Sequence, residues 1–198
     1  MTSMPVRRTF ARGLWRITGW TFVGEPPTEP AGILVGAPHT SNWDFVVMLA
    51  ITWRSGIHAR FLAKKSLFAT PLGFLTRGMG GIPVDRGNPG GLVAELTARV
   101  ASGEQFFVVI AAEGTRSRGE FWKSGFYRLA VDSGLPISLG FVDRSTRTAG
   151  FGPTFRPSGD VAADMDLVRA FYADKGGIHS RNRTEARLRE EPSGTEPT

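Results

Sequence analysis

A histidine and an aspartate five positions apart are the residues of this sequence best suited to acid–base chemistry. His39 and Asp44 stand between an apolar run at 32–37, typical of a buried strand, and an apolar-periodic segment at 45–53, typical of a helix. Their side chains can meet only if the chain bends between them. A carboxylate that holds one imidazole nitrogen leaves the other free to act as a general base. Ser41 and Asp44 also fit a helix capping box, so a purely structural role for Asp44 stays open.

Two further polar clusters follow predicted strands. Asp85-Arg86 comes after a short strand at 82–84, and Glu113 to Arg118 follows the Phe-, Val- and Ile-rich run at 105–112. In open α/β sheets the carboxyl ends of the strands form the ligand crevice, so parallel strands would bring all three clusters together. A glycine turn with hydroxyl and guanidinium groups suits a phosphate. The same residues could instead form an exposed turn with a surface ion pair of little energetic value.

Composition narrows the chemistry. The 198 residues carry a net charge of +6 and contain no cysteine, which removes disulfides and thiolate nucleophiles. Because His39, His58 and His179 lie far apart in the sequence, we expect no metal site. A basic protein can bind nucleic acid, an anionic membrane or a phosphorylated substrate, and charge alone does not decide between them. Nucleic acid is not expected, because the sequence has no recognisable reading helix or stacking platform.

The order of elements predicts a single α/β domain with a mainly parallel or mixed sheet flanked by helices. We expect strands at 32–37, 58–63, 82–84, 105–112 and 137–142, and helices at 43–54, 64–68, 89–102, 123–133 and 161–174, with a Gly/Pro-rich loop after residue 142. The predicted division is a basic amphipathic segment with a Pro-rich linker at 1–30, a catalytic domain at 31–178, and a disordered tail at 179–198.

The amino-terminal segment is rich in arginine and aromatic residues. Residues 1–24 include four arginines and no acidic residue, interspersed with tryptophan, phenylalanine and leucine. The segment is too interrupted by charge to span a bilayer and lacks the pattern of a secretory signal. An amphipathic helix in the interface of an anionic membrane and a first helix packed on the domain are both consistent with this pattern.

Four ordered blocks of this sequence resemble the glycerolipid acyltransferases, and in particular the bacterial 1-acylglycerol-3-phosphate acyltransferases. The blocks span roughly residues 32–142 and are the His-x4-Asp pair, Gly81-Ile82-Pro83-Val84-Asp85-Arg86, Glu113-Gly114-Thr115-Arg116-Ser117, and Leu135-Pro136-Ile137. Four blocks in the family's order are far more specific than any one of them.

The resemblance implies a role for each matching residue. His39 would be the general base that removes a proton from the acceptor hydroxyl, and Asp44 would orient its imidazole. The hydroxyl would then attack the thioester of acyl-CoA or acyl carrier protein without an acyl-enzyme. No cofactor is implied. The residues matching the family's substrate-binding blocks are Arg86, Glu113, Gly114, Thr115, Arg116 and Pro136, with Lys123 a weaker candidate for a phosphate contact.

Some positions depart from the family's pattern and leave the acceptor open. Ala111-Ala112 stand where Phe-Pro is usual, and Pro83 stands where a larger apolar residue is common. From the family resemblance and the basic amino-terminal segment together, we expect a peripheral enzyme at the cytoplasmic face of the membrane that acylates a lysophospholipid. The alternatives are a non-glycerophosphate lipid acceptor, or a non-catalytic binder of anionic lipid. The binder predicts that His39 is dispensable and that affinity falls steeply with salt.

Overall fold

The computed structural model describes residues 18–69, 73–84 and 89–191, together with Thr9, Gly13 and Trp15. Its helices are α2 (Asn42–Ser55), α3 (Lys65–Phe68), α4 (Gly73–Gly78), α5 (Pro89–Ala101), α6 (Gly125–Ser133), α7 (Val161–Tyr172) and the 3-10 turn η1 (Ser180–Asn182). Its strands are β1 (Thr21–Val23), β2 (Ala31–Ala37), β3 (Ala59–Lys64), β4 (Gly81–Val84), β5 (Phe106–Ile110), β6 (Ile137–Asp143) and β7 (Thr148–Phe155).

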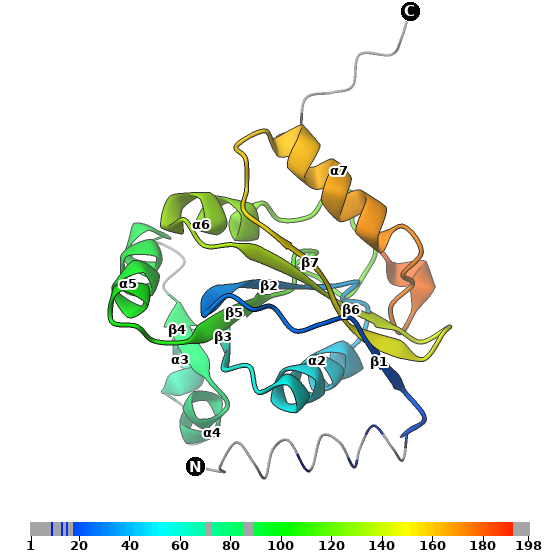
Figure 1. The fold of residues 1–198 in the computed structure, drawn as a ribbon, viewed down its shortest axis with the longest axis horizontal. Coiled ribbons are helices and arrows are strands. Elements are labelled where there is room, and N and C mark those ends of the chain that lie inside the picture. The colour runs from blue at the N-terminus through cyan, green and yellow to red at the C-terminus, as the bar shows by residue number, and fades with distance from the viewer. Residues whose placement is uncertain are drawn as a thin grey trace, which may run out of the picture.

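The described strands form one mixed sheet in the order β1-β7-β6-β2-β5-β3-β4 (Figure 1). Strands β6, β2, β5, β3 and β4 run parallel, β7 is antiparallel to β6, and β1 runs parallel to β7. This arrangement confirms the predicted single α/β domain with a mainly parallel sheet. Pro83 lies in β4 at the edge of the sheet, where a residue without an N–H is tolerated.

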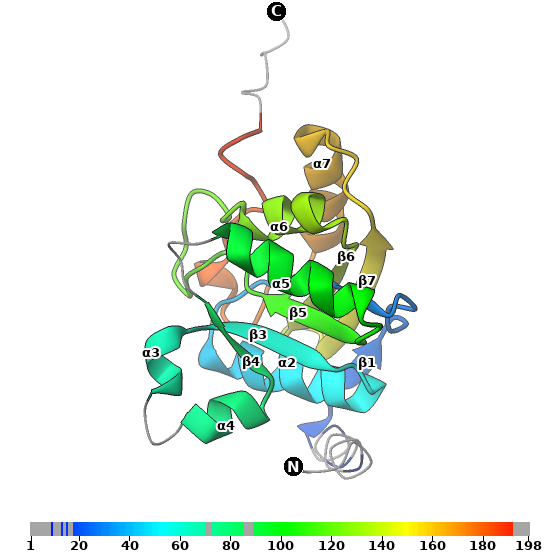
Figure 2. The same ribbon diagram turned by 90° about the vertical axis from the view of Figure 1, so that its left-hand side faces the viewer.

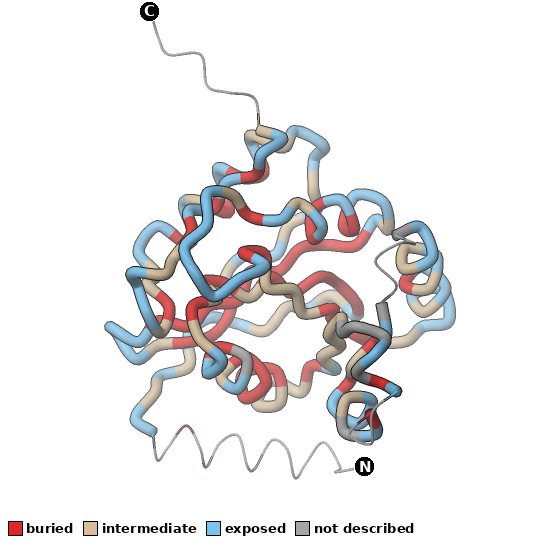
Figure 3. Tube along the Cα trace, turned by 180° about the vertical axis from the view of Figure 1, so that it is seen from behind, coloured by how far each residue is buried: buried red, intermediate tan, exposed pale blue. Residues whose placement is uncertain are grey.

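Helices cover both faces of the sheet (Figures 1 and 2). Along β2, Ile33 and Val35 point to the larger core cluster under α5, α6 and α7, whereas Leu34 points to the second cluster under α2. Because helices cover both faces, the central strands are mostly buried, and the exposed residues lie on the outer surfaces of the helices (Figure 3). Because β2 is covered on both faces, it is an uninterrupted apolar run.

The sequence did not predict β1 and β7. The glycines of β7, which suggested a loop, are instead needed for close packing against neighbouring elements. The segment expected to be a Gly/Pro-rich loop contains β7, and the amino-terminal segment contains β1, so the sheet begins before residue 31. A Cβ on Gly150 would lie 1.8 Å from the Val23 carbonyl oxygen, and one on Gly152 would lie 2.3 Å from the Phe171 ring. These glycines are therefore required for β1 and α7 to approach β7, and do not mark a loop.

The tail expected to be disordered from residue 179 instead packs against the domain over residues 179–191. Thr184, Ala186 and Leu188 are buried, and Leu188 forms a parallel bridge with Trp122. The buried positions alternate with exposed ones, as in a strand that covers an apolar surface. Residues 192–198 lie outside the described residues.

The predicted amino-terminal amphipathic helix lies almost wholly outside the described residues. Within the described ranges, no helix combines the length and apolar character needed to cross a membrane.

Candidate active site

The site begins at the turn between β2 and α2, at the carboxyl edge of the parallel strands. β2 ends at Ala37, a cis peptide bond leads into Pro38, and His39 follows. Asp44 lies in the first turn of α2, and its Oδ2 is 3.7 Å from His39 Nδ1. The bend required by the five-residue spacing is therefore present, and the two side chains face each other.

Asp44 also caps the helix, so both roles considered for it are present. Ser41 is the N-cap of α2 and Asp44 completes the capping box. Oδ2 of Asp44 accepts the backbone N–H groups of Thr40 at 2.5 Å and Ser41 at 2.6 Å. Oδ1 is buried and has no hydrogen-bond partner among the residues that the structure describes. It is the oxygen of Asp44 that remains available to accept an imidazole N–H.

A second buried carboxylate supports this turn from the loop that follows β5, the strand beside β2. Glu113 is 1% exposed, and its Oε2 accepts the backbone N–H of His39 at 3.0 Å. Its Oε1 accepts the backbone N–H of Thr184 at 3.4 Å. Glu113 thus ties the loop after β5 to the backbone of His39 and to the carboxyl-terminal segment. It acts by positioning that backbone.

Burial sets the protonation of these three groups. Burial lowers the pKa of His39 below 6.5, an effect opposed by Asp44 and reinforced by Arg116, so the imidazole is unprotonated at neutral pH and can accept a proton. Burial raises the pKa of Asp44, while the N–H groups of Ser41 and Thr40 oppose that rise. Burial raises the pKa of Glu113 to about 7, again against two backbone N–H donors.

His39 and Asp44 line a cavity of about 200 Å³ between α2 and the sheet. Most of its other lining side chains are apolar, namely Met48, Phe61, Leu62, Val109 and Val142. A cavity with an apolar wall and a single acid–base pair suits a hydrocarbon chain whose reactive end lies at the pair.

The remaining predicted residues divide into those near the pair and those away from it. Arg116 donates a hydrogen bond to Asn42 at the start of α2, and its charge acts on the pKa of His39. Gly114 has a φ of 68° and Thr115 is exposed; the aliphatic stem of Lys123 lies against Gly114. Arg86 lies outside the described residues.

Pro136 does not join the site. Parallel pairing sets Ile33 opposite Ile137, which places buried Pro136 at the start of β6. The other end of β2, at Ala37, is about 17 Å further along the strand at roughly 3.3 Å per residue, and His39 lies beyond it. The Pro136 carbonyl oxygen accepts the Ile33 N–H at 2.8 Å, a structural role in the sheet.

Three supporting contacts were not found from sequence. Buried Tyr172 places its hydroxyl 2.9 Å from the Gly140 carbonyl oxygen and 3.1 Å from that of Val35, beneath the site. Thr184 reaches Glu113, and the His179 N–H donates to Oγ1 of buried Thr40 at 3.0 Å. The alternation of Thr184, Ala186 and Leu188 was the only signal for the carboxyl-terminal contact.

Comparison with known proteins gives the class of the chain. A family model described as Acyltransferase matches residues 21–138, more than half of the sequence. The chain therefore belongs to the acyltransferase family, which confirms the resemblance to the glycerolipid acyltransferases. His39, Asp44 and Glu113 all lie within the match.

A solved structure shares the fold. The crystal structure of the 1-acyl-sn-glycerophosphate (LPA) acyltransferase, PlsC, from Thermotoga maritima matches with a TM-score of 0.55 and 17% identity. The match covers 83% of this chain and 76% of that chain. At this identity the likeness concerns the fold alone. No curated protein matches the chain by sequence.

Proposed function

We propose that this acyltransferase moves a fatty acyl group from acyl-CoA or acyl carrier protein to a hydroxyl of a lysophospholipid such as 1-acylglycerol-3-phosphate. The observation that carries the proposal is the His39–Asp44 pair on the wall of an apolar cavity. The acyl chain of the donor would occupy that cavity, with its thioester carbonyl beside His39. The acyl acceptor of PlsC supports the choice of a lysophospholipid.

The proposed reaction needs no covalent enzyme intermediate. Neutral His39 removes the proton from the acceptor hydroxyl as its oxygen attacks the thioester carbonyl. The tetrahedral intermediate collapses, the C–S bond breaks, and the thiolate takes the proton from the imidazolium. Asp44 orients the imidazole and stabilises its charge during the step. The products are an oxygen ester and a free thiol, so atoms and charge balance.

Cationic side chains near the pair supply the acceptor's phosphate site in this proposal. Arg116 lies beside Asn42 at the start of α2, and Lys123 packs on Gly114 in the same loop region. Arg86 is included from the family motif. A guanidinium that spans two phosphate oxygens would select phosphorylated acceptors over neutral ones.

We place the reaction at the cytoplasmic membrane surface, with the protein bound peripherally. The support is the run of four arginines among aromatic residues in the first 24 positions, together with a net charge of +6. Both the acceptor and the product would be lipids, so attachment to an anionic surface would concentrate the enzyme where its substrates are.

An acceptor panel tests the substrate class. Labelled palmitoyl-CoA is incubated with the protein and 1-acylglycerol-3-phosphate, lysophosphatidylcholine or a neutral monoacylglycerol, and lipid products are separated by mass. We expect label in diacylglycerol phosphate, with Arg116→Gln raising KM for the phosphorylated acceptor more than for the neutral one. Label only in a neutral lipid or glycolipid would move the acceptor to the non-glycerophosphate alternative. Vesicle binding without any acyl transfer from either donor class would contradict the proposal and favour the binder.

A further inference from the structure

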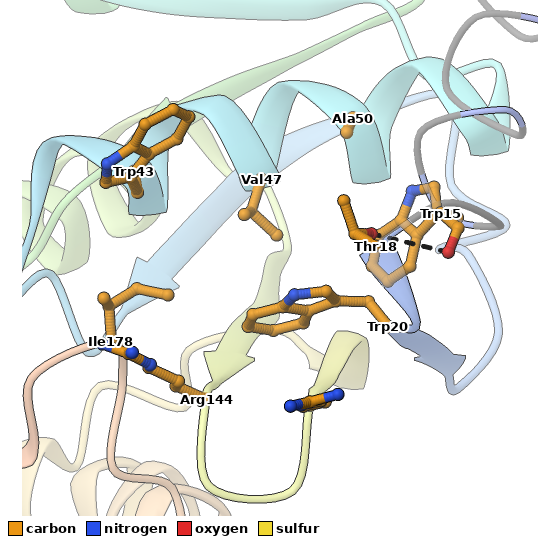
Figure 4. Close-up of a pocket in the computed structure, with 9 residues that line it drawn as sticks. Trp15, Thr18, Trp20, Trp43, Val47, Ala50, Arg144 and Ile178 are labelled. Atoms are coloured by element: carbon orange, nitrogen blue, oxygen red, sulfur yellow. Dashed lines mark hydrogen bonds between the residues drawn. The ribbon is translucent and has the colours of Figure 1, made fainter.

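A second, larger hollow flanks α2 on a different stripe from the catalytic cavity (Figure 4). Its volume is about 520 Å³. Trp43, Val47 and Ala50 line it, whereas Asp44 and Met48, about 100° further round the helix, line the catalytic cavity. The two hollows therefore lie on either flank of α2 and approach each other at its amino-terminal end.

Indole rings form much of the wall. Figure 4 shows Trp43 and Ile178 towards one end of the hollow, Trp15 towards the other, and Trp20 between them. Trp15 is 6% exposed, and it meets Trp20 edge to face at 6.4 Å. The indole N–H of Trp15 is buried without a hydrogen-bond partner among the described residues. Trp43 is 66% exposed. Such amphipathic rings favour the boundary between lipid headgroups and chains.

Two arginines on the turn between β6 and β7 complete the hollow. Arg144 and Arg147 are exposed, and neither guanidinium pairs with a carboxylate in the described part of the chain. Arg147 has a φ of 53°, a conformation that non-glycine residues rarely adopt. The turn is held by Asp143, whose Oδ1 accepts the Ser145 N–H at 3.0 Å and whose Oδ2 accepts the Thr146 hydroxyl at 2.9 Å. Both cations are thus placed by a well-bonded turn.

We propose that this hollow binds one anionic phospholipid of the membrane surface, with its phosphate at Arg144 and Arg147 and its chain along Trp20, Val47 and Ala50. A ligand that fits this hollow needs both an apolar chain for the indole and aliphatic lining and a negative charge for the two arginines. A soluble anion would leave the indole and aliphatic wall in water, and a neutral lipid would leave two guanidinium groups without a counter-charge.

The inference goes beyond the proposed function, because the lipid bound here is not a substrate. It assigns a membrane contact to the α2 side of the domain, where Trp15 and Trp20 of the amino-terminal segment meet Arg144 and Arg147 of the turn between β6 and β7. Since Trp43 and Asp44 are neighbours in the first turn of α2, a lipid held here would set the entrance to the catalytic cavity against the bilayer.

Vesicle binding tests the inference with matched charge variants. Arg144→Gln/Arg147→Gln is compared with Arg128→Gln/Arg156→Gln, which removes two exposed arginines near α6 on the opposite face of the sheet. Binding is measured by flotation with phosphatidylcholine vesicles that contain or lack phosphatidylglycerol. We expect the first variant to bind the anionic vesicles about 30-fold more weakly, from roughly 1 kcal/mol for each basic residue at the surface. The control should stay within about threefold of wild type. Equal losses in both variants would overturn the site.

Two further readouts separate this inference from its alternatives and from the proposed function. Phosphatidylglycerol with brominated chains should quench tryptophan fluorescence, and Trp20→Phe/Trp43→Phe should remove most of that quenching. Acyl transfer between a water-soluble short-chain donor and acceptor should stay within about twofold of wild type in Arg144→Gln/Arg147→Gln, because the hollow is not catalytic. Loss of transfer in that variant, or soluble CoA that displaces the lipid from wild type, would overturn the inference by making the hollow a substrate site.

Discussion

Replacing Glu113 by glutamine should remove a pH dependence of stability that this one buried carboxyl group confers. Burial raises the pKa of Glu113 from 4.5 to about 7. The folded protein therefore binds this proton more tightly than the unfolded chain does. The resulting stabilisation is complete below pH 4.5 and is lost as the pH rises through 7. Between about pH 5 and about pH 8 the loss is about 2.5 kcal/mol, at roughly 1.4 kcal/mol for each unit of pKa.

Glutamine has no carboxyl proton and keeps one carbonyl oxygen for the backbone N–H of His39 or Thr184. The free energy of unfolding is measured by urea titration, with tryptophan fluorescence, for wild type, Glu113→Gln and the control Glu120→Gln. Glu120 is exposed in the same inter-element segment. The difference between wild type and Glu113→Gln should change by about 2.5 kcal/mol between about pH 5 and about pH 8, while the control curve runs parallel to wild type. If the difference in unfolding free energy between wild type and Glu113→Gln stays constant to within about 0.5 kcal/mol over this pH range, burial does not raise the pKa of Glu113.

Three further changes test the catalytic pair, the packing beneath it and the cavity. Asp44→Asn should lower kcat by about 10²–10⁴, with folding retained because the amide oxygen can still cap α2. Because Asp44 raises the pKa of His39, the acidic limb of the pH–rate profile should also move to lower pH, and an unmoved limb would contradict the pairing. Tyr172→Phe should cost about 1–2 kcal/mol in urea unfolding by removing the buried hydrogen bond to Gly140; a neutral effect would argue against that bond. Val109→Phe should fill part of the cavity and reduce kcat/KM for palmitoyl-CoA more than for a short-chain acyl-CoA, and an equal reduction would place the chain elsewhere.

Much of the sheet could be predicted because its strands are buried on both faces and flanked by clear turn signals. The run at 32–37 is continuously apolar and that at 137–142 is apolar except for Ser138, and each is a strand within one residue of its expected bounds. Periodicity does not reveal β7, because Gly150 and Gly152 are dictated by the approach of β1 and α7. Such a tertiary constraint has no local signature.

The proximity of His39 and Asp44 could be predicted for a different reason. The strand-to-helix turn is local, so the spacing of His39 and Asp44 already limits their geometry. Parallel strands predicted that the clusters would meet at one edge of the sheet, but the contact of Glu113 with His39 also depends on β2 and β5 being neighbours, which only the structure shows. Pro136 was placed with the site by motif alone, and strand direction puts it at the opposite end.

The carboxyl-terminal contact could not be predicted because its apolar content is small. Thr184 lies among arginines and glutamates, a composition typical of a solvated tail. What orders this segment is long-range, namely the hydrogen bonds from Thr184 N–H to Glu113 and from the Trp122 indole to the Thr184 carbonyl oxygen.

Acceptor-dependent thiol release tests whether His39 is the base in direct acyl transfer. Free thiol is measured from palmitoyl-CoA with and without 1-acylglycerol-3-phosphate for wild type, His39→Ala and the control His58→Ala. His58 is exposed at the start of β3, at the opposite edge of the sheet from His39. We expect acceptor-dependent release in wild type and His58→Ala, and a loss of at least about 10²-fold in His39→Ala. Acceptor-dependent release that survives in His39→Ala would contradict this role of His39.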